Sequence, residues 1–143
     1  MSGSDVTGRK SRFPMRVRYA DTDPMGVAYY GNYFTWFEVG RTEMLRALGM
    51  SYREVEAAGV RLPVVESGCR YLRPARYDDR LVIETTLAEF GRASLRFEYR
   101  VLHELDGELL ALGWSTHCFL DAAGRLIRPP AFFRELMGRA GLG

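Results

Sequence analysis

Two carboxylates stand close together in a loop near the start of this chain, at Asp21 and Asp23. Pro24 stiffens the backbone after the second carboxylate, and Gly26 permits a tight turn or the close approach of a substrate. Tyr30 follows at the predicted entrance of a helix, where unpaired backbone N–H groups carry a partial positive charge. Such groups polarise a carbonyl, so the pattern predicts an acid that attacks or hydrates an activated carbonyl carbon.

The elements that must position this loop are a short strand before it and a long helix after it. Residues 15–19 alternate apolar and basic side chains, which is the period of a half-buried strand. From Asn32 the apolar residues follow a helical period for about 17 residues and stop at Gly49. Such a helix would be roughly 25 Å long and would cross the core. A second, shorter helix is predicted over 51–59, with Ser51 as its N-cap.

Long strands follow the helices, over 61–73, 80–90, 93–105 and 108–121. The third alternates between apolar and charged side chains, which indicates one buried face and antiparallel pairing. Asp106-Gly107 is a hairpin signal between the last two strands. The order of elements predicts an α+β fold in which a curved antiparallel sheet of about five strands wraps one long helix.

Composition restricts the class of protein. The chain has 143 residues, of which 47% are hydrophobic and 27% charged, and this favours one globular domain. We expect a flexible tail over 1–13 and a single domain over 14–143. The tail lacks the apolar region of a signal peptide, and no apolar run is long enough to span a membrane. A net charge of +2 gives no argument for nucleic-acid binding, although all basic residues except Lys10 are arginines, which bind phosphate well.

The cysteines and histidines give no pattern of metal ligands. Cys69 and Cys118 lie in strand-like segments, which favours buried free thiols in a cytoplasmic protein over a disulfide or a zinc site. His103 and His117 also fall in predicted strands and are expected to be neutral, hydrogen-bonded structural residues. No pair of these side chains has metal-ligand spacing, so no metal is expected.

Several stretches of the sequence together point to a family. Residues 19–33 read YADTDPMGVAYYGNY, with WFE at 36–38 and RTE at 41–43 in the predicted helix. This pattern closely resembles the 4-hydroxybenzoyl-CoA thioesterase branch of the hotdog-fold thioesterases. The segment CRYLRPARYDD at 69–79 is similar to the family's second strand and the turn after it, so the resemblance covers residues 14–121. It implies a hotdog fold that hydrolyses acyl-CoA thioesters without a metal or organic cofactor.

The resemblance implies that the second carboxylate of the loop, Asp23, is the essential acid. The backbone N–H of Tyr30 would bind the thioester carbonyl oxygen, and the helix dipole would support the developing oxyanion. Asp23 would attack the carbonyl carbon as a nucleophile or activate a water molecule as a general base, and the sequence leaves both roles open. Asp21 is interpreted as a residue that caps the loop. Glu38 and Arg41 are spaced to form an ion pair on the helix.

Further substrate contacts are expected from three places. Gly26, Val27 and Tyr29 belong to the acidic loop. Glu66 would face the acyl pocket, because alternate residues of its predicted strand, at 64, 66 and 68, share one side. A structural or specificity role is expected for it rather than a catalytic one. Arg92 lies in a region that resembles the place where the family sets basic residues against the phosphates of CoA. The alternative for Arg92 is a solvated arginine at a turn.

Other functions fit parts of the pattern. A hotdog domain could bind acyl-CoA or acyl carrier protein without turning it over. Asp-x-Asp after a strand also occurs in aspartate-dependent phosphatases of the haloacid dehalogenase type, but Met25 and the alternating Arg16 and Arg18 do not fit that class. A sheet that wraps one helix leaves open edges, so we predict a homodimer or homotetramer, with strands paired between copies and sites at the subunit interface.

Overall fold

A computed structural model describes residues 5–7 and 9–141 of the chain. In chain order the elements are β1 (Asp5–Thr7), β2 (Lys10–Arg16), a 3-10 turn η1 (Tyr19–Asp21), α1 (Asn32–Ala47), α2 (Tyr52–Ala57), β3 (Val64–Tyr71), β4 (Arg80–Phe90), β5 (Ser94–His103), β6 (Leu109–Cys118) and α3 (Ala131–Arg139). The strands form one sheet in the order β1-β2-β4-β5-β6-β3, and every neighbouring pair is antiparallel.

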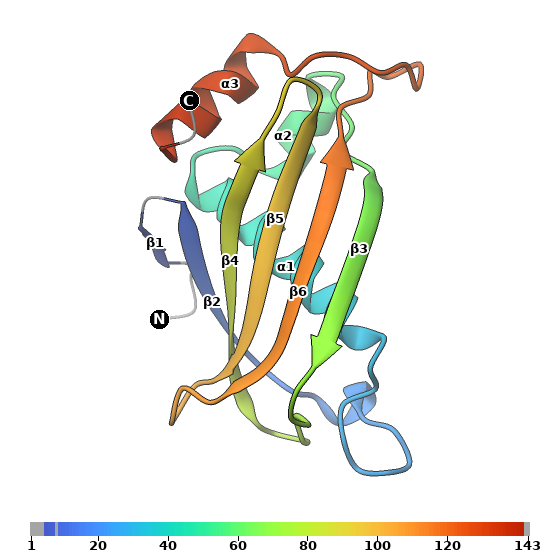
Figure 1. Ribbon diagram of the computed structural model, residues 1–143, viewed down its shortest axis with the longest axis vertical. Coiled ribbons are helices and arrows are strands. Elements are labelled where there is room, and N and C mark those ends of the chain that lie inside the picture. The colour runs from blue at the N-terminus through green and yellow to red at the C-terminus, as the bar shows by residue number, and fades with distance from the viewer. Residues whose placement is uncertain (1–4, 8, 142–143) are drawn as a thin grey trace.

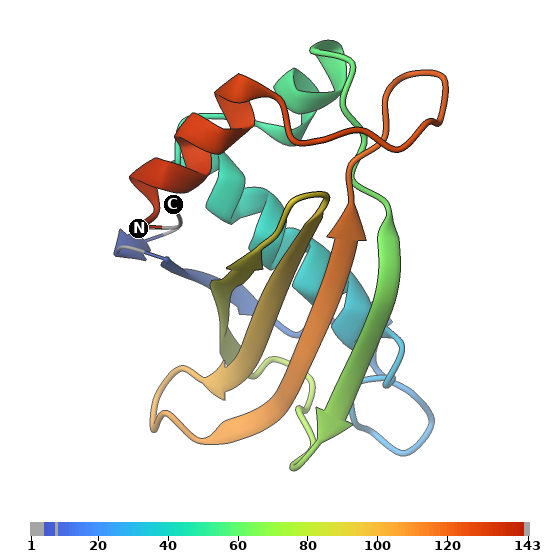
Figure 2. The same ribbon diagram turned by 45° about the horizontal axis from the view of Figure 1, so that its top comes forward.

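The sheet wraps the long helix, as the sequence predicted. Figure 1 shows α1 crossing behind the strands, and Figure 2 shows the sheet curving around it while α2 and α3 lie at one end. Five long strands carry the sheet, and the three-residue β1 extends it at one edge. This arrangement is the predicted α+β hotdog fold.

The core lies between α1 and the sheet. The buried residues of the helix are Tyr33, Trp36, Phe37, Gly40, Met44 and Leu45. Burial of each large apolar side chain contributes about 1.5–3 kcal/mol. The Phe37 ring stacks on that of Tyr99 in β5, with the ring centroids 4.4 Å apart. Glycines allow this close approach, because a Cβ at Gly113 of β6 would collide with the Phe37 ring.

The strand before the acidic loop lies earlier in the chain than the sequence pattern predicted. β2 covers Lys10–Arg16 and pairs with β4, so the predicted domain boundary at residue 13 falls inside a paired strand. Residues 10–13 are therefore not a flexible tail, whereas residues 1–4 and 8 lie outside the described residues. The expected strand at 15–19 ends at Arg16, because the chain turns into η1 at Tyr19. Pairing with a distant strand overrides the weak local signal of this polar segment.

Candidate active site

The two carboxylates of the acidic loop have different surroundings. Asp21 is buried, and its carboxylate accepts hydrogen bonds from the Arg18 backbone N–H at 2.9 Å and from Arg18 Nη2 at 2.9 Å. Burial by itself would raise the pKa of Asp21, but the hydrogen bonds and charge of Arg18 outweigh it and lower that pKa. Asp23 is only half-buried, and its Oδ1 accepts the Met25 N–H at 2.8 Å. Asp21 thus caps the loop, as expected, whereas the Asp23 side chain remains partly accessible to solvent.

Backbone hydrogen bonds hold the Asp23 turn closed. The Asp23 N–H donates to the Val27 carbonyl at 2.9 Å, and the Gly26 N–H donates to the Asp23 carbonyl at 2.9 Å. Gly26 has a φ of +81°, a conformation that glycine adopts without strain. The loop is tied to the rest of the molecule by the Ala28 N–H, which donates to the Ala75 carbonyl at 2.8 Å. The Asp23 carboxylate is therefore presented on a rigid turn.

A cavity of about 290 Å³ adjoins this turn and the entrance of α1. Its lining residues are Asp23, Met25, Val27, Ala28, Tyr30, Tyr33, Tyr71, Leu72, Arg73 and Pro74. Three of the expected site residues, Asp23, Val27 and Tyr30, thus meet in one cavity. Gly26 lies within the same turn, and the Tyr29 ring packs on that of Tyr30 with centroids 4.7 Å apart.

The Tyr30 peptide is positioned by a residue that the sequence interpretation did not select. The Tyr71 hydroxyl, at the end of β3, donates to the Tyr30 carbonyl oxygen at 2.9 Å. That carbonyl also accepts the Tyr33 N–H at 3.3 Å in the first turn of α1. Among the described residues, nothing accepts a hydrogen bond from the Tyr30 N–H. Tyr71 lies in the segment 69–79 that resembles the family, and this resemblance was a signal in the sequence that could have pointed to it. Its contact with Tyr30 joins residues that are distant in the sequence and forms only in the folded chain.

Glu66 lies on the opposite face of the sheet from the helix. A β-bulge separates Val64 from Glu66, so the prediction that these two residues share one side is wrong. Val64 lines a cavity together with Phe34 and Phe37 of α1. Glu66 instead shares the outer face with Gly68, over which the indole of Trp114 lies. Glu66 is exposed and lies outside the Asp23 cavity.

Arg92 lies at the far end of the molecule from Asp23. It is exposed in the turn between β4 and β5, whereas the acidic loop adjoins the start of β4 through the Val17 N–H, which donates to the Asp79 carbonyl at 3.0 Å. β4 has 11 residues, so its ends are roughly 35 Å apart. Figure 1 shows the β4–β5 turn and the acidic loop at opposite ends. Arg92 is therefore not part of the Asp23 cavity of the same chain.

The two histidines differ in the hydrogen bonds that their rings make. His117 is buried, with Nδ1 at 3.0 Å from the Leu62 carbonyl oxygen and Nε2 at 2.8 Å from Ser115 Oγ. Burial lowers the pKa of His117 to about 4, so it is neutral as expected. His103 lies 3.7 Å from carboxylate oxygens of both Asp79 and Asp106, but its Nδ1 makes no hydrogen bond among the described residues.

Residues 5–7 and 9–141 also lack two further features, a cluster of metal ligands and a helix that could cross a membrane. No group of three or more His, Cys, Asp or Glu side chains in these residues could hold a metal ion. Both cysteines are free, and they are half-buried rather than buried. No helix in the described part of the chain is both long and apolar enough to cross a membrane.

The chain is similar to known thioesterases in sequence and in fold. Residues 17–137 match the family described as the thioesterase-like superfamily. The acyl-CoA thioester hydrolase YbgC of Escherichia coli O6:H1 is 39% identical over 92 residues, which cover 64% of this chain and 69% of that protein. The DHNA-CoA thioesterase of Staphylococcus aureus has a TM-score of 0.85 at 30% identity, covering 92% of this chain and 89% of that one.

A further solved structure links the fold to the branch that the sequence resembles. A 4-hydroxybenzoyl CoA thioesterase mutant complexed with 4-hydroxybenzoyl CoA has a TM-score of 0.81 at 26% identity. That match covers 90% of this chain and 99% of the other. The family match spans most of the chain and includes the acidic loop, the long helix and all four long strands after it. The chain therefore belongs to the thioesterase-like superfamily, has its hotdog fold, and is a thioester hydrolase.

Proposed function

We propose that this protein hydrolyses an acyl-CoA thioester to a free carboxylic acid and CoA. The observation that carries the proposal is that Asp23 and Tyr30 line the same cavity, at the entrance of α1. Family membership supports the thioester as the bond that is cleaved. The names of the similar proteins support the CoA part of the substrate, since YbgC is called an acyl-CoA thioester hydrolase.

In the proposed mechanism, the thioester carbonyl oxygen accepts a hydrogen bond from the Tyr30 N–H. The positive end of the α1 dipole stabilises the negative charge that develops on this oxygen. Asp23 Oδ1 is held by the Met25 N–H, and Oδ2 accepts no hydrogen bond from the described residues, so Oδ2 is the oxygen that reacts. Gly26, Val27 and Tyr29 shape the turn and the wall beside the acyl group.

Two routes remain for Asp23. As a nucleophile, Oδ2 bonds to the carbonyl carbon, the C–S bond breaks, CoA leaves as a thiolate, and water hydrolyses the mixed anhydride. As a general base, Asp23 takes a proton from a water molecule, whose oxygen bonds to the carbonyl carbon before the C–S bond breaks. A thiolate is a good leaving group because thiols ionise near pH 8.5. Neither route therefore requires a strong general acid.

We propose that two copies pair through their β3 edges. β3 is an edge strand of the sheet, and the exposed Val64, Val65, Tyr71 and Leu72 lie along or beside it. Antiparallel pairing about a two-fold axis would set the Val64 end of one strand beside the Tyr71 end of the other. The partner's Arg92 would then lie at the Asp23 end of the sheet, where it could contact CoA phosphates. A homotetramer would add a second such pair, and a stable monomer in sedimentation would contradict both.

Release of thiol from a panel of acyl-CoA thioesters tests the function. Asp23→Asn should lower kcat by at least about 100-fold, because an amide is neither nucleophile nor base at this position. Asp78→Asn is the matched control: Asp78 is exposed, and its positive φ of 69° suits asparagine equally well. Equal rates for wild type and Asp23→Asn would overturn the role of Asp23.

The alternative is a domain that binds acyl-CoA or acyl carrier protein without catalysis. It predicts no thiol release from any thioester while acyl-CoA still binds in calorimetry. Thiol release from acyl carrier protein thioesters but not from acyl-CoA would leave the proposed mechanism in place and would change the carrier of the acyl group. A cytoplasmic location stays a prediction, which fractionation of cells would test.

A further inference from the structure

A line of hydrogen-bonding groups runs between α1 and the sheet. Arg41 Nη1 lies 3.4 Å from Tyr99 Oη, which lies 2.5 Å from Ser115 Oγ. Ser115 Oγ lies 2.8 Å from His117 Nε2, and His117 Nδ1 lies 3.0 Å from the Leu62 carbonyl oxygen. Tyr99, Ser115 and His117 are each no more than 2% exposed. The line therefore connects a helix side chain to the core of the sheet.

Chemistry fixes the direction of every bond in this line. A carbonyl oxygen only accepts, so His117 Nδ1 carries the proton and Nε2 is an acceptor. Ser115 must then donate to Nε2 and accept from the Tyr99 hydroxyl. Tyr99 in turn accepts from Arg41. One donor of the Arg41 guanidinium is thereby used, while the other N–H groups of this five-donor fork remain.

Arg41 differs from the other arginines of the chain in its ionic partners. All arginines belong to the described residues, and only Arg41 and Arg96 are not exposed. Arg96 pairs with Glu98 at 3.2 Å, whereas no carboxylate of the described residues lies within 4.0 Å of the Arg41 guanidinium. The expected pair of Arg41 with Glu38 is absent, although Glu38 lies one turn away. A half-buried guanidinium without an anion is costly, because its charge is partly removed from water.

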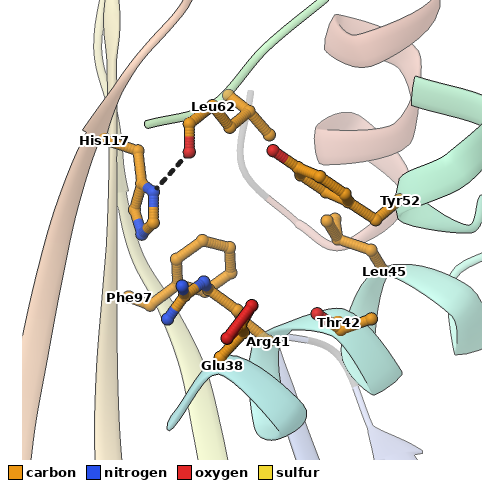
Figure 3. Close-up of a pocket in the computed structure, with 8 residues that line it drawn as sticks. All are labelled: Glu38, Arg41, Thr42, Leu45, Tyr52, Leu62, Phe97 and His117. Carbon is orange, nitrogen blue, oxygen red and sulfur yellow. Dashed lines mark hydrogen bonds between the residues drawn. The ribbon is translucent and has the colours of Figure 1, made fainter. Parts of the chain in front are cut away.

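Arg41 borders a cavity of about 90 Å³ between α1, α2 and the sheet (Figure 3). The other lining residues are Glu38, Thr42, Leu45, Tyr52, Leu62, Phe97 and His117. Leu45, Leu62 and Phe97 provide apolar walls, and the Arg41 and Glu38 side chains of α1 line the same cavity (Figure 3). The cavity shares no lining residue with the one beside Asp23.

We propose that this cavity binds the carboxylate of a short-chain organic acid. Arg41 donates two parallel hydrogen bonds to the two carboxylate oxygens, a geometry for which the guanidinium fork is suited. The short hydrocarbon part lies against Leu45, Leu62 and Phe97. Tyr99, held by Ser115 and His117, fixes the orientation of the guanidinium. This site does not depend on the proposed function of Asp23.

Calorimetric titration with sodium propionate tests the site, with sodium chloride as the ionic-strength control. Propionamide, which has the same shape without the charge, should bind at least about 10-fold more weakly. Arg41→Gln should weaken propionate binding by about 10-fold or more. Arg46→Gln, which removes an exposed arginine from the same helix, should leave it unchanged. No heat from propionate in the wild type, or equal affinity in Arg41→Gln, overturns the proposal.

A second variant decides the question if Arg41→Gln does not fold. Glu38 is exposed and its carboxylate borders the same cavity, so it repels a bound anion. Glu38→Gln should therefore tighten propionate binding by about 2- to 5-fold at low salt, and the gain should fall in 0.5 M sodium chloride. Unchanged or weaker binding in Glu38→Gln would show that propionate does not bind beside Glu38 and Arg41, and would overturn the proposal.

Discussion

Replacing Gly40 by alanine tests how tightly α1 packs on the sheet. A Cβ at this position would lie 2.5 Å from Thr85 Oγ1 and 2.9 Å from Ile83 Cγ2, both on β4. Thr85 and Ile83 are fully buried and β-branched, so their side chains have few other rotamers and no open space. Alanine gains about 1 kcal/mol over glycine in a helix, whereas overpacking a core costs about 1–3 kcal/mol. We expect a net loss of up to about 2 kcal/mol, because two contacts are too short.

The matched control is Gly138 of α3, a helical glycine at which an added Cβ would meet no other atom. Nothing lies within 4 Å of a Cβ there, so Gly138→Ala should gain about 0.5–1 kcal/mol. Urea unfolding followed by circular dichroism measures both changes, provided that the slope of each transition is unchanged. Adding Thr85→Ala to Gly40→Ala should recover part of the loss, because it removes the nearest atom. A Gly40→Ala protein as stable as Gly138→Ala would refute the packing argument.

Three further predictions concern single side chains. Between pH 6.5 and about 4, His117 binds a proton in the unfolded chain but not in the folded protein. The free energy of unfolding should therefore decrease as the pH is lowered through this window. The loss is at most about 3 kcal/mol, and urea unfolding of His117→Gln should lack this part of the slope. Tyr71→Phe should lower kcat by about 3- to 10-fold with little change in KM, because it removes only the hydrogen bond from the Tyr71 hydroxyl to the Tyr30 carbonyl oxygen. An unchanged kcat would exclude this positioning role. Asp21→Asn should cost about 1–3 kcal/mol in thermal or urea unfolding, because it breaks the bonds to Arg18 that close η1, and unchanged stability would contradict that role.

The acidic loop and the helix after it follow from local chemistry. α1 covers Asn32–Ala47, close to the predicted span, because the periodic apolar face and the stop at Gly49 are properties of neighbouring residues. α2 begins after Ser51, whose hydroxyl accepts the Glu54 N–H at 3.2 Å, as the capping pattern indicated. The capping role of Asp21 was also accessible from the sequence, and Asp23 stays the predicted acid.

Other features depend on strands that are distant in the sequence. Glu66 changes face because one extra residue in β3 forms a bulge against β6, and a shift of one residue reverses the side of a strand. Lys10–Arg16 becomes a strand because β4 offers it a partner, not because of its own composition. Arg41 donates to Tyr99 of β5 rather than to Glu38 on its own helix, and helical spacing alone does not reveal such a contact.

By itself, the sequence determined the class of the fold, the acid of the loop and the peptide at the helix entrance as the candidates for chemistry, since turn and helix signals act over a few residues. Only the tertiary structure decided which side chains join them. It adds Tyr71, turns Glu66 away and sets Arg92 at the far end of the same chain. The physical reason is that strand pairing and register are set by contacts between distant segments, and one bulge or one strand length moves a side chain to another face or end.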